Sequence, residues 1–220
     1  YEVRSFRHSH LDSTTIGGNN ITALYEDKEG RLWIGYLGWG VDVSDPDKTK
    51  FRKIEFPDTA LRKVSTIVHH FTEDSLGNIW VSTNSGLFII KKAKDKFTGV
   101  SFHDFWNDVP IFKAIERPTI LFTDKKGNVW IGTETGLCMF DPDKRKLKEP
   151  ESFDGLPSHE IQDIGYDHEG KLWVSCQNDG ARLFYISPEI NLFKSFDGIP
   201  IQSKVRGLSF TFDLDNRIWV

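Results

Sequence analysis

The chain has 220 residues, of which 38% are hydrophobic and 13% aromatic, with a formal net charge of −4. A disordered chain would have few aromatic residues and a high net charge, so this composition excludes that class and predicts a folded core. The 28 basic residues are outnumbered by 32 acidic ones, and the densest basic run, 91–96 ("KKAKDK"), is typical of a solvated hairpin, which argues against nucleic-acid binding.

A lead-in at residues 1–19 precedes a motif that occurs four times and begins a fifth time. The first strand of each copy is predicted in a short run rich in β-branched and aromatic residues. These runs are 21–26 ("ITALYE"), 68–73 ("VHHFTE"), 119–123 ("TILFT"), 161–166 ("IQDIGY") and 207–212 ("GLSFTF"). Helical repeats would instead show the helical period over longer stretches.

A four-residue turn follows each first strand, with Asp at its first position and Gly at its fourth. This combination favours a type I turn, in which the carboxylate accepts hydrogen bonds from backbone amides two residues on. Gly adopts the positive φ with which the chain enters the second strand of the hairpin. In the fifth copy Asn216 takes the place of this Gly. The turn residues are Asp27 and Gly30, Asp74 and Gly77, Asp124 and Gly127, Asp167 and Gly170, and Asp213.

The second strand of each copy is apolar on both faces, as in "RLWIG" and "NIWVS". Such a strand is expected to be buried on both faces, between two stacked sheets. Each second strand carries one tryptophan, which we predict to be a wedge between neighbouring sheets because an indole buries a large area. The alternative is a sugar-stacking ladder. These tryptophans are Trp33, Trp80, Trp130, Trp173 and Trp219.

Third and fourth strands follow in each copy, for example 86–91 ("GLFIIK") and 97–102 ("FTGVSF"). The repeated tryptophans are 47, 50, 43 and 46 residues apart, close to the length of a four-stranded propeller blade. The predicted fold class is therefore all-β, a β-propeller of four blades and part of a fifth, all in one incomplete domain. The predicted bounds are 1–19 for the outer strand and linker of a preceding blade, 20–66, 67–117, 118–160 and 161–204 for the four blades, and 205–220 for the start of a further blade.

The repeat resembles the two-component regulator propeller family. The shared pattern is I-x-x-[IL]-x-x-D-x-x-G-x-[LIV]-W-[IV]-G-T-x-x-G-L, and the copies at 119–147 and 71–90 are most similar to it. The resemblance covers the chain from about residue 21 to its end and is specific because the pattern recurs at constant phase. It implies seven-bladed propellers, which at this spacing need roughly 320 residues, so we expect this chain to be a fragment.

The same resemblance implies a function. Such propellers form the extracytoplasmic, periplasmic part of membrane-anchored sensors, many of them hybrid two-component systems of gut Bacteroidetes. The resemblance thus implies an oligosaccharide ligand derived from a polysaccharide, a homodimer in the full-length protein, and a histidine kinase outside this segment. We expect no catalysis in this chain, and its partners to be the remaining blades or a second chain.

Candidate ligand-binding residues lie where a loop departs from the repeat. After the second strand the family pattern is Gly-Thr-x-x-Gly, but the first copy has Tyr36 and Trp39 there, and the fourth has Gln177, Asn178 and Asp179 after a cysteine. An aromatic ring beside amides and a carboxylate is a plausible sugar platform at the mouth of the central channel. Drift of an unconstrained loop is the alternative.

A second candidate lies in the longest interval between tryptophans. Residues 101–118 contain Trp106, flanked by Asp104, Asn107 and Asp108. Extended loops often carry function, although this segment could equally be an outer connection whose aromatic residues plug the rim of a blade.

No cofactor and no metal site are expected. One of His69 and His70 is expected to pack in the core, and the two cysteines, Cys138 and Cys176, are not expected to pair.

Two other classes of protein stay open, because a fold alone does not decide function. One is a propeller enzyme, similar to streptogramin lyases or glycosidases. Sialidase-like glycosidases bind the substrate carboxylate with a cluster of arginines, whereas Arg31 and Arg217 occupy positions of the repeat framework. The other is a protein-interaction scaffold of the WD type. This sequence lacks the Gly-His and Trp-Asp signature of such scaffolds, which weighs against that class.

Overall fold

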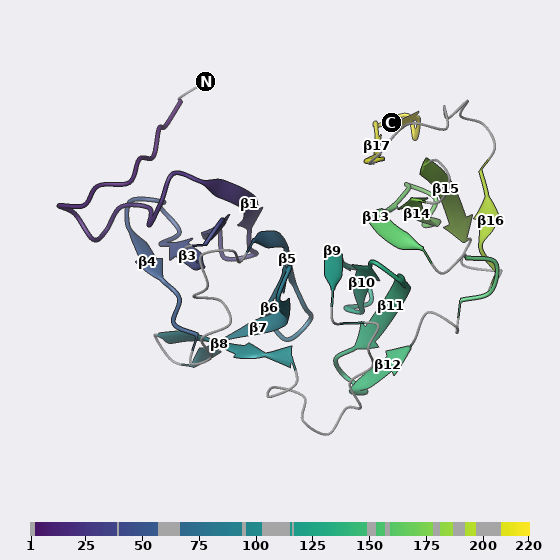
Figure 1. Ribbon diagram of the computed structural model, residues 1–220. Helices are drawn as coiled ribbons and strands as arrows, with labels where there is room; N and C mark the ends of the chain where they lie inside the picture. Colours follow the sequence, from purple (N-terminus) through teal and green to yellow (C-terminus); the bar gives the residue numbers. More distant parts are fainter. Residues whose placement is uncertain are drawn as a thin grey trace. The chain divides into compact units, whose positions relative to one another are not determined.

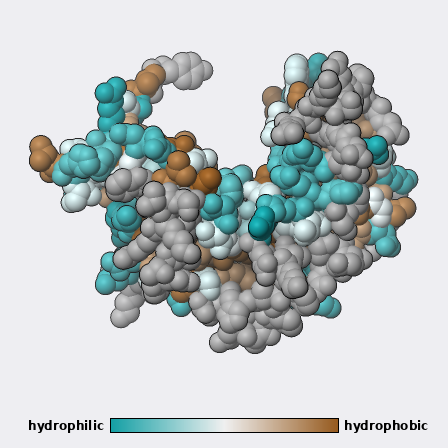
Figure 2. Space-filling view, viewed as in Figure 1, coloured by the Kyte–Doolittle hydropathy of each residue, from teal (hydrophilic) through white to brown (hydrophobic). Residues whose placement is uncertain are grey.

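The computed structural model describes residues 3–38, 40–56, 67–93, 96–102, 115, 117–148, 153–156, 159–177, 181–186, 192–196 and 208–220. The chain forms two compact units, Tyr1–Asn107 and Asp108–Val220, and both are built from antiparallel sheets (Figure 1). No helix within the described ranges is long and apolar enough to cross a membrane. On the face drawn in Figure 2, hydrophobic residues form separate patches among hydrophilic ones.

The first unit contains two four-stranded sheets, each with its strands in sequence order. One sheet consists of β1 (Ile21–Glu26), β2 (Leu32–Tyr36), β3 (Val41–Ser44) and β4 (Phe51–Lys53). The other consists of β5 (Val68–Glu73), β6 (Ile79–Thr83), β7 (Gly86–Ala93) and β8 (Lys96–Ser101). One hydrophobic cluster contains buried residues of both sheets, so the sheets are stacked.

The second unit repeats this arrangement. Its first sheet consists of β9 (Pro118–Thr123), β10 (Val129–Thr133), β11 (Gly136–Asp141) and β12 (Lys146–Lys148). Its second sheet consists of β13 (Glu160–Tyr166), β14 (Leu172–Gln177), β15 (Ala181–Ile186) and β16 (Lys194–Ser195). A hairpin of β17 (Thr211–Phe212) and β18 (Ile218–Trp219) follows.

These sheets confirm the predicted all-β repeat of four strands. The first strand of the fifth copy differs from its prediction at 207–212, because the described strand β17 covers only Thr211 and Phe212.

The predicted geometry of the turns is also confirmed. In each of the five turns the fourth residue donates its N–H to the carbonyl of the first, over 2.9–3.2 Å. Gly30, Gly77, Gly127 and Gly170 have φ between 79° and 84°, and Asn216 has φ 60°.

The second strands of the four four-stranded sheets are buried along almost their whole length, as their apolar character on both faces predicts, whereas the fifth, β18, is largely exposed. Three of the tryptophans lie in clusters that join two successive copies. Trp33 is buried with residues of the β5–β8 sheet, Trp130 with residues of the β13–β16 sheet, and Trp173 with residues of the final hairpin. The wedge role is therefore confirmed for these three, and the sugar-ladder alternative does not apply to them.

The lead-in packs on the first sheet. Ile16 is buried in a cluster with Ile34, Tyr36 and Phe51. Two backbone bonds hold the segment in place: Phe51 donates its N–H to the Thr14 carbonyl over 2.7 Å, and Leu37 donates to the Asn20 carbonyl over 3.1 Å. The segment that enters β1 is thus tied to the sheet that it precedes.

Candidate functional site

In every copy the turn Asp also binds the tryptophan six residues later. The indole Nε1 donates to the carboxylate Oδ2 over 2.7 Å between Trp33 and Asp27, and over 2.8–3.0 Å in the other copies. The other carboxylate oxygen of Asp27 accepts two backbone N–H groups, each over 3.0 Å. The carboxylate therefore clamps the turn to the second strand, a bond that the turn pattern alone does not predict.

These bonds favour the ionised carboxylate. Burial disfavours the charged form of Asp27, but hydrogen bonds from Trp33 and Arg31 outweigh it, so the pKa of Asp27 lies below its usual value. At Asp213 the hydrogen bonds from Trp219 and Arg217 likewise lower the pKa. A carboxylate engaged in this way is a structural group, because its lone pairs are already used within the copy.

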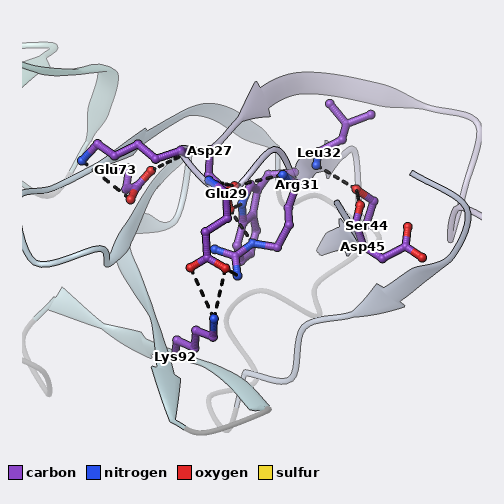
Figure 3. Close-up of polar contacts among 10 residues, drawn as sticks. Asp27, Glu29, Arg31, Leu32, Ser44, Asp45, Glu73 and Lys92 are labelled. Carbon is purple, nitrogen blue, oxygen red and sulfur yellow. Dashed lines mark hydrogen bonds and ion pairs between the residues drawn. The ribbon is translucent and has the colours of Figure 1, made fainter. Parts of the chain in front are cut away.

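The turn between β1 and β2 carries further ion pairs, shown in Figure 3. Arg31 donates through Nε to Asp27 and through Nη1 to Glu29, each over 2.7 Å. Glu29 also accepts from Lys92 on β7, and Glu73 of β5 accepts the backbone N–H of Lys28 over 2.9 Å. These contacts join two stacked sheets at the end of the sheet that carries the turns.

The opposite end of each sheet is where the copies differ. The pairing of the first with the second strand shifts register at the same place in all four sheets. One residue of each first strand is left unpaired there, and these bulge residues are Thr22, His69, Thr119 and Gln162. β-Bulges re-aim a side chain and are frequent beside functional sites. The bulge is thus a repeated feature that carries threonine in two copies, histidine in one and glutamine in one.

A second variable position lies at the same end. It is the residue that follows the buried part of each second strand: Leu37, Asn84, Glu134 or Gln177. Because antiparallel pairing brings the end of one strand to the start of its neighbour, this residue lies beside the start of the first strand. Asn84 donates its N–H to the Ile67 carbonyl, and Glu134 donates to the Arg117 carbonyl, each over 3.2 Å. We call the four bulge residues and these four residues the end positions.

The end positions offer hydrogen-bonding groups of several kinds. In the fourth copy, Gln162 donates through Nε2 to Gln177 Oε1 over 2.6 Å. In the third, Glu134 pairs with Arg117 over 2.9 Å, and both side chains are exposed. Partial burial lowers the pKa of His69 below its usual value, because it disfavours the charged imidazolium. Amide, carboxylate, hydroxyl and imidazole groups at equivalent places suit recognition of a polar ligand.

Two of the predicted binding residues fall in described parts of the chain. The position of Tyr36 corrects its expected role as an exposed platform: the side chain is 0% exposed. Its hydroxyl donates to Asp42 over 2.9 Å and accepts the N–H of Gly17. Gln177 occupies an end position and stays a candidate. The remaining candidates lie outside the described residues: Trp39, Asp104, Trp106, Asn178 and Asp179.

Tyr36 was a misleading candidate because of its phase in the repeat. The third residue after each framework tryptophan is Tyr36, Thr83, Thr133 or Cys176, and all four are buried. The fourth residue after each of these tryptophans is the end position, where side chains reach solvent. Comparing the copies in phase would have identified the end positions, because they are the places near this edge where polar groups change from copy to copy.

The two cysteines lie inside the sheets of the second unit. Cys138 and Cys176 are both buried, and burial raises the pKa of the Cys176 thiol to about 12. A thiol with so high a pKa is a poor nucleophile. Within the part of the chain that the structure describes, no group of three or more His, Cys, Asp or Glu is arranged to hold a metal ion.

Four-stranded antiparallel sheets that stack through buried tryptophans are typical of the blades of a β-propeller. Residues 15–38 match the model of the two component regulator propeller family, which confirms the resemblance of the repeat. No curated protein sequence matches the chain.

Solved structures with the same fold span nearly the whole chain. The extracellular domain of a hybrid two component system from B. thetaiotaomicron is 22% identical with a TM-score of 0.70, over 93% of this chain and 26% of that one. A second such domain is 18% identical with a TM-score of 0.71, over 100% and 30%. Virginiamycin B lyase from Staphylococcus aureus is 17% identical with a TM-score of 0.67, over 98% and 66%. At these identities the likeness establishes the fold, and the chain spans between a quarter and a third of the two sensor domains.

Proposed function

We propose that this chain is a ligand-sensing, non-catalytic segment of a hybrid two component sensor. The observation that carries the proposal is the contrast between the two ends of each sheet. At one end the Asp–Trp clamp repeats unchanged, and at the other the end positions carry a different pair of side chains in each copy. The family match at residues 15–38 and the fold shared with sensor extracellular domains support the same role.

The ligand in this proposal is an oligosaccharide derived from a polysaccharide. Amides such as those of Asn84 and Gln177 can donate to and accept from the same sugar hydroxyl groups, which charged side chains alone cannot do. An aromatic face completes such a site by covering the apolar face of a sugar ring. Trp39 and Trp106 are the proposed aromatic contributors, with Asp104, Asn178 and Asp179 as further polar groups.

The proposal extends to the whole protein. It places the propeller outside the cytoplasm, in the periplasm, with a histidine kinase and a dimer interface in parts of the protein beyond this segment. The ligand would have to bind one conformation better than another, because equal binding to both transmits nothing.

The test is calorimetric titration of the purified protein with oligosaccharide mixtures from hydrolysed polysaccharides. Gln177→Ala and Asn84→Ala are expected to weaken binding at least tenfold with only a small fall in the melting temperature, because each side chain accepts one hydrogen bond within its sheet. Lys126→Ala is the matched control, because this exposed residue lies in a turn at the opposite end of its sheet. Binding that is equal in all four proteins would remove the end positions from the ligand site.

A second function, cleavage of a streptogramin, is favoured by one observation. The fold match with virginiamycin B lyase covers 98% of this chain and 66% of the enzyme. Incubation with quinupristin, the compound present in that structure, followed by mass spectrometry distinguishes the two. The sensor proposal predicts an unchanged mass, and time-dependent conversion of quinupristin would overturn it in favour of a lyase.

A further inference from the structure

We propose that His8 and His10, in the loop before the first sheet, form a two-histidine site for a divalent transition-metal ion such as Zn²⁺, Ni²⁺ or Cu²⁺. The loop comprises residues 8–16 and lies in the first unit. This site is separate from the end positions, and its test does not depend on the proposed sensor function. It departs from the sequence-based expectation that the chain binds no metal.

The two rings already stand at a ligand-to-ligand distance. His8 Nε2 lies 3.2 Å from His10 Nδ1, and the ring centroids are 4.5 Å apart with an interplanar angle of 85°. Two imidazole nitrogens that each bind Zn²⁺ at about 2.0–2.1 Å in a tetrahedron are about 3.3 Å apart. The spacing therefore suits a shared metal ion, which would enter once both rings turn so that their nitrogens face it.

The second nitrogen of His8 determines which atom faces the metal. His8 Nδ1 lies 2.7 Å from the carbonyl oxygen of Ile16. A carbonyl only accepts, so Nδ1 carries the proton and Nε2 keeps the lone pair that a metal needs. Metal-binding histidines characteristically donate their other N–H to a backbone carbonyl in this way, which fixes the tautomer and orients the ring.

His10 changes tautomer on binding. In the metal-free state its Nδ1 donates to His8 Nε2, because His8 Nε2 has no proton to give. With the metal between the rings, His10 keeps its proton on Nε2 and offers the Nδ1 lone pair instead. His10 is exposed, so water can carry that proton from one nitrogen to the other.

The loop that holds the pair is ordered by its own hydrogen bonds. The backbone N–H of His8 donates to Asn19 Oδ1 over 3.1 Å, and that of Ser9 donates to Thr15 Oγ1 over 3.0 Å. Ile16, which receives the bond from His8, is buried against the first sheet. Because the ligands are positioned before the metal arrives, binding requires little loss of conformational freedom.

The site would be open rather than closed. No third protein ligand joins the pair among the described residues, so water or an exchangeable ligand would complete the coordination. A bound cation also polarises the His8 ring and strengthens the bond from its Nδ1–H to Ile16. Metal binding should therefore tighten the loop against the β1–β4 sheet.

The experiment is titration of the untagged protein with ZnCl₂, NiCl₂ and CuCl₂ by calorimetry. One ion per chain is expected, with Cu²⁺ bound more tightly than Ni²⁺ or Zn²⁺. His10→Ala should lower the affinity at least tenfold. His168→Ala is the matched control, because His168 is an exposed histidine in the turn after β13, and it should leave the affinity unchanged.

A second measurement reports on the loop itself. Trypsin can cleave after Arg7, which is exposed and directly precedes His8. Zn²⁺ should slow this cleavage severalfold in the parent protein and in His168→Ala, but not in His10→Ala. The proposal is overturned if no saturable one-to-one binding occurs, if His10→Ala binds as the parent does, or if Zn²⁺ slows cleavage equally in all three proteins.

Discussion

The turn between β1 and β2 and the turn between β17 and β18 have the same local bonds but opposite burial. Arg31 donates to Asp27 over 2.7 Å, and Arg217 donates to Asp213 over 2.8 Å. The side chain of Arg31 is 8% exposed and that of Arg217 is 68% exposed. The tryptophans differ in the same way, because Trp33 is 0% exposed and Trp219 is 61% exposed.

The cause of the difference is the neighbouring sheet. In the first unit, Phe97 of β8 packs edge-on against Trp33 with ring centroids 5.1 Å apart, and the Arg31 guanidinium lies 4.8 Å from the centre of the same ring. Trp219 belongs to none of the buried clusters formed by described residues. The comparison teaches that the clamp is made locally, whereas its contribution to stability depends on what covers it.

The largest effect is expected from removing the two tryptophans. Trp33→Ala should lower the free energy of unfolding by about 3–5 kcal/mol, because it deletes a fully buried indole and leaves a cavity. Trp219→Ala should lower it by less than about 1 kcal/mol, since most of that ring already faces solvent. Denaturant titration of both variants measures the difference, and equal losses would show that burial does not set the contribution.

The carboxylates should show a smaller contrast. Asp27→Asn should lower the free energy of unfolding by about 2–3 kcal/mol, because buried N–H groups of the turn, Arg31 and Trp33 lose a charged acceptor. Asp213→Asn should change it by less than about 1 kcal/mol, since water can replace the carboxylate in an exposed turn. The comparison fails if the fifth-copy variant is destabilised as much as Asp27→Asn.

Removing the two arginines should give a still smaller difference in the free energy of unfolding than removing the two carboxylates. Arg31→Ala should cost about 1–2 kcal/mol through the lost contact with Phe97 and the buried bond to Asp27. Arg217→Ala should stay within about 0.5 kcal/mol of the parent, because exposed ion pairs contribute little. Thermal melting at low and at high salt checks this, and a salt-dependent loss is expected only where the pair faces solvent.

The smallest effect concerns pH. The pKa of Asp27 is lowered in the folded state, so its contribution is fully present above the unfolded pKa, about 3.9. It is lost as pH falls through the lower folded pKa. Acid unfolding of Asp27→Asn should therefore be less steep below about pH 4 than that of the parent. An identical pH dependence of the two proteins would show that Asp27 is not a source of acid sensitivity.

Local chemistry explains what the sequence predicted well. Asp and Gly at fixed places in a four-residue turn specify the bend and the positive φ of Gly30 and its equivalents, whatever surrounds them. A strand that is apolar on both faces favours burial on both, which places Trp33, Trp130 and Trp173 between successive copies. The fold class and the repeat follow from these short-range rules, because each acts over fewer than ten residues.

Tertiary structure decided the rest. Tyr36 looked like an exposed departure from the repeat, yet Asp42 and Gly17 take up its hydroxyl inside the first sheet. The bulge at His69 and Gln162 is invisible in the sequence, because a shift of register is a property of two paired strands rather than of one. Likewise, His8 and His10 are two residues apart in any conformation, but only the folded loop sets their nitrogens 3.2 Å apart with the Ile16 carbonyl behind them. The sequence by itself determined the bonds made within a turn, and the packing of one element on another decided which of its groups meet solvent or a ligand.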